Sequence, residues 1–309
     1  MKEVVVLSGK GGTGKTSVVA AFAALADRKV LADCDVDAAD LHLILTPETL
    51  RVEEFQGRRR ARIVLDLCAG CGVCAEHCRF GAIAFDGPGN GAIAKTYRVD
   101  PLACEGCGVC GHVCPTRAVE FGLGRDGEWY ISETRHGPLV HARLDPGGEN
   151  SGKLVTLVRE RARQLAKDRA LDLLLVDGSP GIGCPVIASV AGTDLVLGVA
   201  EPTLSSQHDL ERLVALTAHF RIPMAVCINR ADLNPEVASA IERWCQARGI
   251  RVVGRIPYDS VFNDAQAQRK SVVEVGNGPA ATALREVWQE THATLTESRG
   301  VPNAFTKSG

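Results

Sequence analysis

Residues Ser8–Thr16 read Ser-Gly-Lys-Gly-Gly-Thr-Gly-Lys-Thr, and this stretch decides the fold. The Val-rich apolar segment Glu3–Leu7 precedes it and predicts a buried strand. The segment Ser17–Asp27 follows it, is rich in Ala, lacks Gly and Pro, and predicts a helix. The glycine and lysine spacing matches the phosphate-loop pattern G-x-x-x-x-G-K-[ST] in the strand–loop–helix context that this pattern requires. The sequence therefore predicts a nucleotide site.

The loop supplies groups suited to phosphate and to a magnesium ion. Glycines let successive backbone N–H groups converge on an anion, and the helix N-terminus adds its positive end. We expect Lys15 to reach the outer phosphates and the Thr16 hydroxyl to bind Mg²⁺. The residues expected to bind ATP or ADP in this loop are Gly9, Lys10, Gly11, Gly12, Thr13, Gly14, Lys15, Thr16 and Ser17.

A second lysine, Lys10, opens the run Lys-Gly-Gly-Thr-Gly-Lys-Thr. This run resembles the deviant phosphate loop of the MinD/Mrp/ParA group of ATPases, which are relatives of the nitrogenase iron protein. The resemblance implies that Lys10 crosses a dimer interface to contact phosphate bound by the other subunit. It thus implies a catalytic role for Lys10 beside Lys15, in a homodimer or a heterodimer with a paralogue. The alternative is a solvated loop lysine.

Three aspartates follow apolar segments that predict strands. Asp33 ends the segment Lys29–Asp33, Asp35 lies two residues later, and Asp177 follows the apolar segment Leu171–Val176. The resemblance implies that Asp35 activates the attacking water, and that Asp33 and Asp177 support Mg²⁺. The alternative for each is an ordinary capping or turn aspartate.

Two further positions are expected near the nucleotide base. Asn229 ends the predicted strand Met224–Asn229, and Pro257 opens a Pro-Tyr-Asp run after the predicted strand Arg251–Ile256. The resemblance implies that Asn229 reads the adenine edge and that Pro257 belongs to the loop lining the base pocket. Asn229 could instead terminate its strand at a turn.

Eight of the twelve cysteines form a duplicated run with the spacing C-x₂-C-x₂-C-x₃-C. The first run is Cys68, Cys71, Cys74 and Cys78, and the second is Cys104, Cys107, Cys110 and Cys114. The duplication resembles bacterial two-cluster ferredoxins, in which the fourth cysteine of each run binds the other cluster. The resemblance implies one [4Fe–4S] cluster on Cys68, Cys71, Cys74 and Cys114 and another on Cys104, Cys107, Cys110 and Cys78. Zinc or disulfides are the alternatives, but structural zinc usually takes its ligands as two separated pairs. Arg79 follows Cys78 where the ferredoxin pattern has Pro, so the two clusters could differ in potential or exposure.

The segments around the cysteines predict short strands and turns. Arg51–Gln56 and Arg62–Asp66 read as strands flanking a solvated hairpin tip at residues 57–60, which is Gly-Arg-Arg-Arg. Residues 121–131 predict a second hairpin, and residues 136–152 carry little periodic pattern.

Composition excludes several classes of protein. The chain has 309 residues, 45% of them hydrophobic and 23% charged, as in soluble globular proteins. The net charge of −2 gives no basis for nucleic-acid binding. We expect no signal peptide and no membrane anchor, since no apolar run is long enough to cross a bilayer and the tail lacks a basic amphipathic face. Twelve cysteines without an export signal indicate reduced thiols and a cytoplasmic location.

Alternating strand and helix patterns predict an α/β fold, a doubly wound and mostly parallel P-loop NTPase sheet. We expect this ATPase domain at residues 1–60 and 124–297, an inserted bacterial-ferredoxin-like α+β domain at 61–123, and a flexible tail at 298–309. The whole chain resembles MinD-superfamily ATPases with an inserted ferredoxin domain.

That resemblance implies ATP hydrolysis with Mg²⁺, slow without a partner, coupled to electron transfer through two [4Fe–4S] clusters to a redox or metallocofactor partner protein. One alternative is an ATPase that carries iron–sulfur clusters or metallocofactors for assembly. Another is a spatial-positioning ATPase like MinD and ParA.

Overall fold

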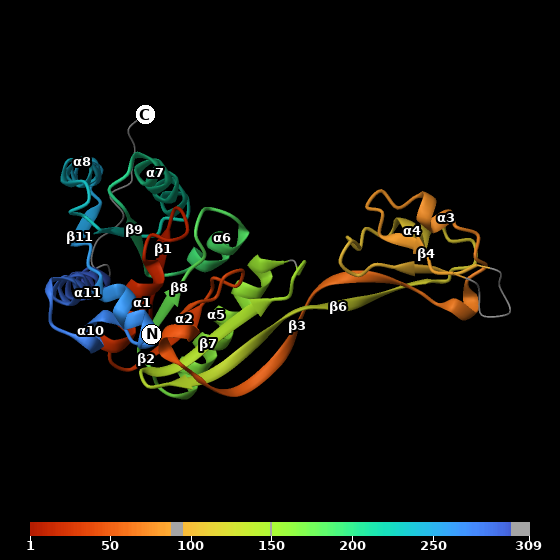
Figure 1. Cartoon of the computed structure of the whole chain (residues 1–309), viewed down its shortest axis with the longest axis horizontal. Coiled ribbons are helices and arrows are strands. Elements are labelled where there is room, and N and C mark those ends of the chain that lie inside the picture. Colours follow the sequence, from red (N-terminus) through yellow and green to blue (C-terminus); the bar gives the residue numbers. More distant parts are fainter. Residues whose placement is uncertain (88–94, 149, 298–309) are drawn as a thin grey trace. The chain divides into compact units, whose positions relative to one another are not determined.

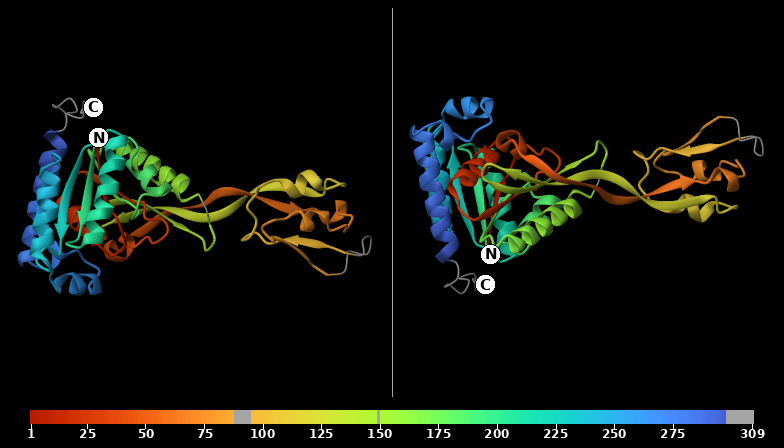
Figure 2. Two further views of the ribbon diagram at one scale, coloured as in Figure 1. Left: turned by 90° about the horizontal axis from the view of Figure 1, so that it is seen from above. Right: turned by 90° about the horizontal axis from the view of Figure 1, so that it is seen from below.

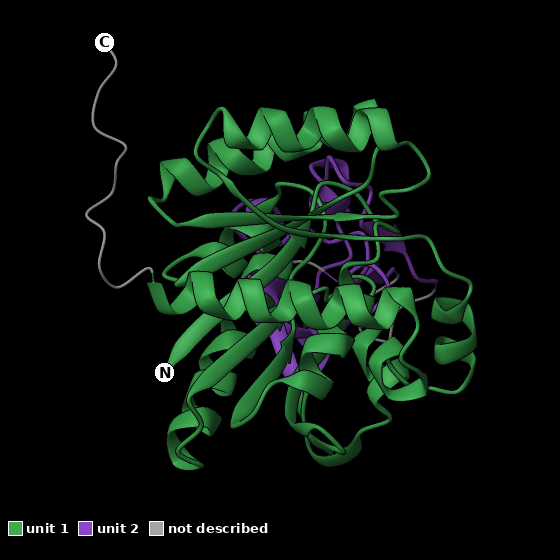
Figure 3. Ribbon diagram, turned by 90° about the vertical axis from the view of Figure 1, so that its left-hand side faces the viewer, with its two compact units in different colours: residues 1–53, 129–143, 151–309 green, residues 54–128, 144–150 purple. Residues whose placement is uncertain are grey.

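The computed structural model describes residues 1–87, 95–148 and 150–297, which form two compact units (Figure 3). The first unit comprises residues 1–53, 129–143 and the described chain from 151 onward, and the second comprises 54–128 and 144–150. The second unit therefore begins before the predicted insertion at 61–123, ends after it, and takes in a further short segment. The predicted tail at 298–309 lies outside the described residues.

A nine-stranded sheet forms the centre of the first unit, with the strand order β11-β10-β9-β1-β8-β2-β7-β6-β3 (Figure 1). Seven of its strands are β1 (Lys2–Ser8), β2 (Lys29–Asp33), β7 (Gly137–Leu144), β8 (Leu173–Asp177), β9 (Leu195–Ala200), β10 (Met224–Asn229) and the edge strand β11 (Arg251–Ile256). Every pairing among these strands is parallel. β1 lies at the centre because its run of valines is buried from both faces. The predicted mostly parallel P-loop sheet is confirmed.

Helices cover both faces of this sheet, as the positions of α11 and α5 on opposite sides show in Figure 2. One face carries α1 (Lys15–Leu25), α2 (Leu41–Leu45), α9 (Val261–Ala267), α10 (Val272–Val275) and α11 (Pro279–Glu297). The other carries α5 (Ser151–Asp168), α6 (Cys184–Val190), α7 (Leu204–His219) and α8 (Pro235–Gln246). Among the described residues, we find no helix with the length and apolar character needed to cross a membrane.

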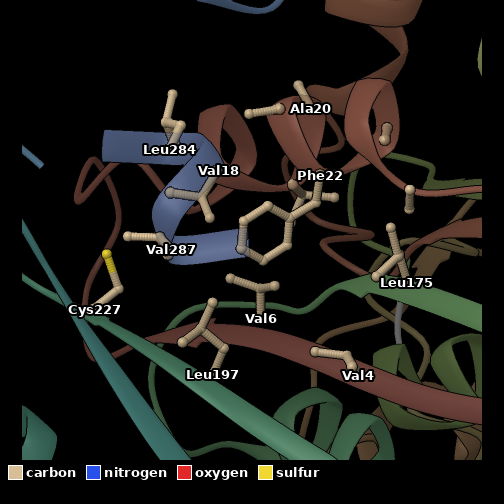
Figure 4. Packing of buried hydrophobic residues seen from close by; sticks show 14 of the residues in the cluster. Val4, Val6, Val18, Ala20, Phe22, Leu175, Leu197, Cys227, Leu284 and Val287 are labelled. Atoms are coloured by element: carbon tan, nitrogen blue, oxygen red, sulfur yellow. The ribbon is translucent and has the colours of Figure 1, made fainter. Parts of the chain in front are cut away.

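The main core lies between the sheet and α1. Phe22 of α1 is fully buried and packs in one cluster with Val6 and Leu197 (Figure 4). Alternate residues of a strand face opposite sides of the sheet, so Cys227 joins this cluster while Val226 joins the core beneath α7 and α8. This packing fixes α1, and with it the loop that precedes α1.

Two long strands replace the predicted hairpins. β3 runs from Glu48 to Ile63 without a break, so the predicted hairpin tip at residues 57–60 was wrong. β6 runs from Val119 to Thr134, so the predicted hairpin at 121–131 was wrong as well. The reason lies in Asp126, which is fully buried and accepts hydrogen bonds from the backbone amides of Gly57 and Arg58. It also pairs with the Arg60 guanidinium, so this arginine contacts a buried carboxylate and not only solvent.

The second unit holds both cysteine runs among short elements. These are the 3₁₀ turn η1 (Leu65–Leu67), α3 (Val73–Glu76), α4 (Val109–Val113), β4 (Ile83–Phe85) and β5 (Tyr97–Val99). β4 and β5 pair antiparallel, with Ile83 opposite Val99. The buried cluster of this unit includes Cys74, Cys104 and Cys110. These three of the eight cysteines therefore form part of the core of the unit.

Candidate functional site

The phosphate loop lies between β1 and α1 and borders a cavity of about 560 Å³. From the loop and the start of α1, the cavity is lined by Gly11, Gly12, Thr13, Gly14, Lys15, Thr16 and Ser17. Gly14 has φ +87°, and a Cβ atom there would lie 2.4 Å from the Asn229 amide nitrogen. Only glycine satisfies both conditions. The cavity is large enough for a nucleotide and is bordered by the predicted phosphate loop.

Lys15 lies among buried carboxylates. Its Nζ is 2.6 Å from Asp177 Oδ1 and 3.3 Å from Asp35 Oδ2. Burial alone would lower the pKa of Lys15, but Asp177 and Asp35 raise it above its usual value. Burial raises the pKa of Asp35, an effect that Lys15 partly offsets. Asp35 therefore binds a proton more readily than an exposed aspartate, which suits a group that takes a proton from water.

The same cluster offers one unpartnered carboxylate oxygen to a divalent cation. One lysine faces three aspartates, since Asp33 is also fully buried beside Asp177. Burial and Asp177 raise the pKa of Asp33. Asp33 binds the backbone amides of Asp35 and Leu41 through its two oxygens, so its carboxylate is held by the chain. Asp177 Oδ2 is buried and has no hydrogen-bond partner, which leaves one carboxylate oxygen free to bind Mg²⁺ directly or through water.

The eight cysteines of the duplicated runs border two small hollows, each lined by cysteines from both runs. Cys68, Cys71, Cys74 and Cys114 line one hollow. Cys104, Cys107, Cys110 and Cys78 line the other. We call these the Cys114 hollow and the Cys78 hollow. Each contains three cysteines of one run and the last cysteine of the other, which is the grouping that the ferredoxin resemblance implied.

The chemistry of the two hollows fits iron bound by thiolates. Their remaining lining is mostly apolar, with Ile63 and Tyr97 in the Cys114 hollow and Phe80 and Phe121 in the Cys78 hollow. Within the described ranges no three His, Cys, Asp or Glu side chains could hold a single metal ion. A four-iron cluster differs, because each of its four cysteines binds a different iron.

Hydrogen bonds to sulfur differ between the hollows. Cys114 Sγ lies 3.3 Å from the amide nitrogen of Ala118 and 3.7 Å from the Thr116 hydroxyl. Burial raises the pKa of the Cys114 thiol, but the Thr116 hydroxyl and neighbouring amides outweigh it and lower that pKa overall. In the Cys78 hollow, Cys104 Sγ lies 3.5 Å from the Ala61 amide nitrogen.

Comparison with known proteins identifies the family to which the chain belongs. The model of the CobQ/CobB/MinD/ParA nucleotide binding domain matches residues 4–272, which is most of the chain. The chain belongs to this family. A solved structure of the septum site-determining protein MinD with Mg-ADP from Pyrococcus horikoshii is similar over 97% of this chain and 99% of its own, with a TM-score of 0.58 and 14% identity.

Two relatives add to this placement. An uncharacterized protein of Methanocaldococcus jannaschii, MJ0578, is 34% identical over 75% of this chain and 79% of its own length. An iron-sulfur cluster carrier protein of Pyrococcus abyssi is 25% identical over 48% of this chain and 55% of its own. Members of the CobQ/CobB/MinD/ParA family bind nucleotides, so nucleotide and Mg²⁺ binding are expected here.

Lys10, the additional lysine of this family member, is held within its own chain. Its Nζ lies 3.6 Å from Glu201 Oε2 and 3.5 Å from the Ser205 hydroxyl. Glu201 also pairs with Arg230. A lysine that contacts phosphate on another subunit would have to leave Glu201 first. Gly9 lies beside this group, against Asp209 of α7.

The base end of the cavity includes residues that the sequence did not indicate. Asn229 lines the cavity, and its side-chain nitrogen donates a hydrogen bond to the Thr13 carbonyl oxygen at 2.8 Å. Pro257 is not among the lining residues, but the next two residues are. Tyr258 and Asp259 belong to the Pro-Tyr-Asp run that the resemblance placed at the base pocket. The lining residues not predicted include Arg230, Phe262, Asn263 and Gln266. A Phe on a short helix gave no distinctive signal in the sequence.

Proposed function

We propose that the chain is an ATP-hydrolysing iron–sulfur protein in which ATP-dependent dimer closure controls electron transfer through two [4Fe–4S] clusters to a partner protein. The grouping of the cysteines carries this proposal: two hollows, each lined by four cysteines from both runs, share one chain with a nucleotide cavity. A phosphate loop alone would support only the ATPase part.

For hydrolysis, each residue has a role that its position supports. Lys15 neutralises the outer phosphates once ATP draws it from Asp177, and Thr16 and Asp177 hold Mg²⁺. Asp35 lines the cavity, accepts a proton from the attacking water, and so helps form ADP and inorganic phosphate. The raised pKa of Asp35 favours this proton transfer.

For electron transfer, the Cys114 hollow and the Cys78 hollow would each hold one cluster through four thiolates. When bound, a [4Fe–4S] cluster accepts and gives up one electron at a time. The protein supplies the thiolates, the amides near sulfur and the apolar walls that limit water. Lys10 would link dimer closure to ATP, because leaving Glu201 frees it to bind phosphate.

The test is a redox titration of the anaerobically purified protein with and without a non-hydrolysable ATP analogue, together with the rate of electron transfer to an artificial acceptor dye. We expect the analogue to shift a cluster potential or change the transfer rate. The Lys15→Ala variant, which lacks the phosphate-binding lysine, is the control and should not respond. Identical potentials and rates with and without the analogue in the native protein would refute the coupling.

A second candidate is an ATPase that delivers iron–sulfur clusters to other proteins. The similarity to the Pyrococcus abyssi carrier protein favours it, as does the exposure of Cys71 and Cys107. Labelled iron distinguishes the two functions. A carrier passes label to an apo-protein during ATP turnover, whereas an electron-transfer protein retains it.

A further inference from the structure

We propose that Thr116 makes the two clusters unequal, raising the reduction potential of the cluster in the Cys114 hollow so that an electron comes to rest there. Phe80 occupies the corresponding position at the Cys78 hollow, and its side chain has no group that can donate a hydrogen bond to sulfur. This inference rests on the proposed function, because it assumes that both hollows hold clusters.

The internal duplication identifies the two positions as equivalents. Cys114-Pro115-Thr116 in the second run corresponds to Cys78-Arg79-Phe80 in the first. Thr116 and Phe80 are therefore each two residues after the cysteine that crosses to the other run's hollow. Both side chains line the hollow that their cysteine enters. One contributes a hydroxyl group and the other an aromatic ring.

The contact at Thr116 is a direct one to a ligand atom. Thr116 Oγ1 lies 3.7 Å from Cys114 Sγ, and the two atoms are joined by a hydrogen bond. A thiolate bound to iron carries no proton, so the hydroxyl must then be the donor. The Ala118 amide donates to the same sulfur at 3.3 Å. Cys114 thus has a side-chain donor in addition to a backbone donor.

At the Cys78 hollow the ring of Phe80 packs with Phe121 in the apolar cluster of the second unit. A ring has no donor for sulfur and excludes water from its surroundings. Hydrogen bonds to the sulfurs and solvent exposure are among the factors that set the potential of an iron–sulfur cluster. Reduction adds negative charge to the cluster and its thiolates, so a donor favours the reduced form. We therefore expect the cluster in the Cys114 hollow to have the higher reduction potential and to hold the electron.

Charged groups near the Cys78 hollow act in the opposite direction, but weakly. The Arg79 guanidinium lies 4.8 Å from the Phe80 ring centroid, and Arg59 lies 5.7 Å from that of Phe121. Both arginines are exposed, so water and salt screen their charge. Thr116 is exposed as well, but its hydroxyl contacts a ligand sulfur directly, whereas each arginine contacts only an aromatic ring. We therefore expect the hydroxyl to decide the order of the two potentials.

The experiment is a redox titration of the full-length protein, monitored by EPR, after iron and sulfide analysis. Native protein should show two separate reduction steps. Thr116→Val should lower the higher potential and leave the lower one unchanged, while Thr116→Ser, which keeps the hydroxyl, should behave like the native protein. Phe80→Thr, with iron content as its folding check, should raise only the lower potential and bring the two steps together.

Three results would overturn the proposal: a single potential shared by both clusters in the native protein, no shift in Thr116→Val, or a shift of the lower potential in that variant. The iron analysis separates this failure from that of the proposed function. Protein that holds two clusters with potentials insensitive to Thr116 refutes only this inference. Protein that binds no clusters refutes both.

Discussion

At the scale of single residues, both lysines of the phosphate loop are held by carboxylates of their own chain. Lys15 contacts Asp177 and Asp35 in a buried cluster, whereas Lys10 contacts Glu201 and is 40% exposed. An entering triphosphate must therefore compete with protein acids for both cations. The cost of removing each lysine should differ, because burial and not charge alone sets the strength of an ion pair.

Replacing Lys15 by Met should lower the free energy of unfolding of the nucleotide-free protein by about 3 kcal/mol, since it leaves buried carboxylates without their cation. Replacing Lys10 by Met should lower it by less than about 1 kcal/mol, since that pair is partly exposed. Urea unfolding without added nucleotide or Mg²⁺ measures both. Equal losses for the two variants would contradict this account of the cluster.

A buried histidine should make stability depend on pH. Burial and the nearby His42 lower the pKa of His141 from 6.5 to about 4. The unfolded chain therefore binds the proton more readily between these values, and stability falls as pH decreases through that window. The loss from pH 7 to pH 5 should be about 2 kcal/mol.

Urea unfolding at pH 7 and pH 5 under anaerobic conditions measures this effect. His141→Gln should remove most of the pH dependence. The same substitution at the exposed His208 should leave it in place. A His141→Gln variant with the native pH dependence would show that other groups cause it.

Some residues of the two candidate sites could be predicted from the sequence and others could not. Local spacing was sufficient to find the phosphate loop that lines the cavity and the cysteines that line the two hollows, because each pattern is formed mostly by neighbouring residues. Phe262 and Gln266 come to the nucleotide cavity only through the packing of α9, more than 240 residues beyond the loop. A single sequence carries no pattern for such long-range contacts. Within the Pro-Tyr-Asp run, Tyr258 and Asp259 line the cavity and Pro257 does not.

At the scale of elements, the feature that escaped prediction is the pair of long strands β3 and β6. An arginine run beside a glycine is typical of a solvated turn. That expectation was wrong because Arg60 pairs with the buried carboxylate of Asp126, which lies 66 residues further along the chain. A continuous apolar run is sufficient to indicate a strand buried on both faces, so β1, β2, β8, β9 and β10 were predicted, whereas no strand was predicted within residues 136–152, where β7 lies. β3 and β6 depend instead on a partner that is distant in the sequence.

Asp126→Asn should therefore destabilise the protein by about 3 kcal/mol, because it removes the charge that pairs with Arg60 and weakens two backbone hydrogen bonds. Glu120→Gln breaks an exposed pair with Arg62 on the same strands and should cost less than about 1 kcal/mol. Urea unfolding combined with iron retention measures both variants. Similar small effects would show that Asp126 does not hold the strands together.

At the scale of the whole molecule, one chain combines a nucleotide cavity with two cysteine-lined hollows. The proposed coupling requires that a nucleotide change the association of two chains. In the proposed dimer, Lys10 must leave Glu201 of its own chain before it can contact phosphate on the second chain. Dimer formation is therefore a property that a single lysine should control.

With a non-hydrolysable ATP analogue, the native protein should change from monomer to dimer in size exclusion with light scattering. Lys10→Ala should bind the analogue and remain monomeric, because the phosphate loses its contact from the second subunit. Lys2→Ala, which removes a partly exposed lysine paired with Asp194, is the control and should still dimerise. Normal dimerisation of Lys10→Ala would exclude a role for this lysine between subunits.

The exchange of last cysteines between the two runs has a consequence for biosynthesis. The Cys78 hollow lacks its full set of four thiols until the nascent chain includes Cys110, and the Cys114 hollow lacks its full set until the chain includes Cys114. A ribosome that has translated only the first run has completed neither set of four cysteines. If the hollows hold the proposed clusters, cofactor insertion must wait until both halves of the duplication exist, and loading of one half must depend on the folding of the other.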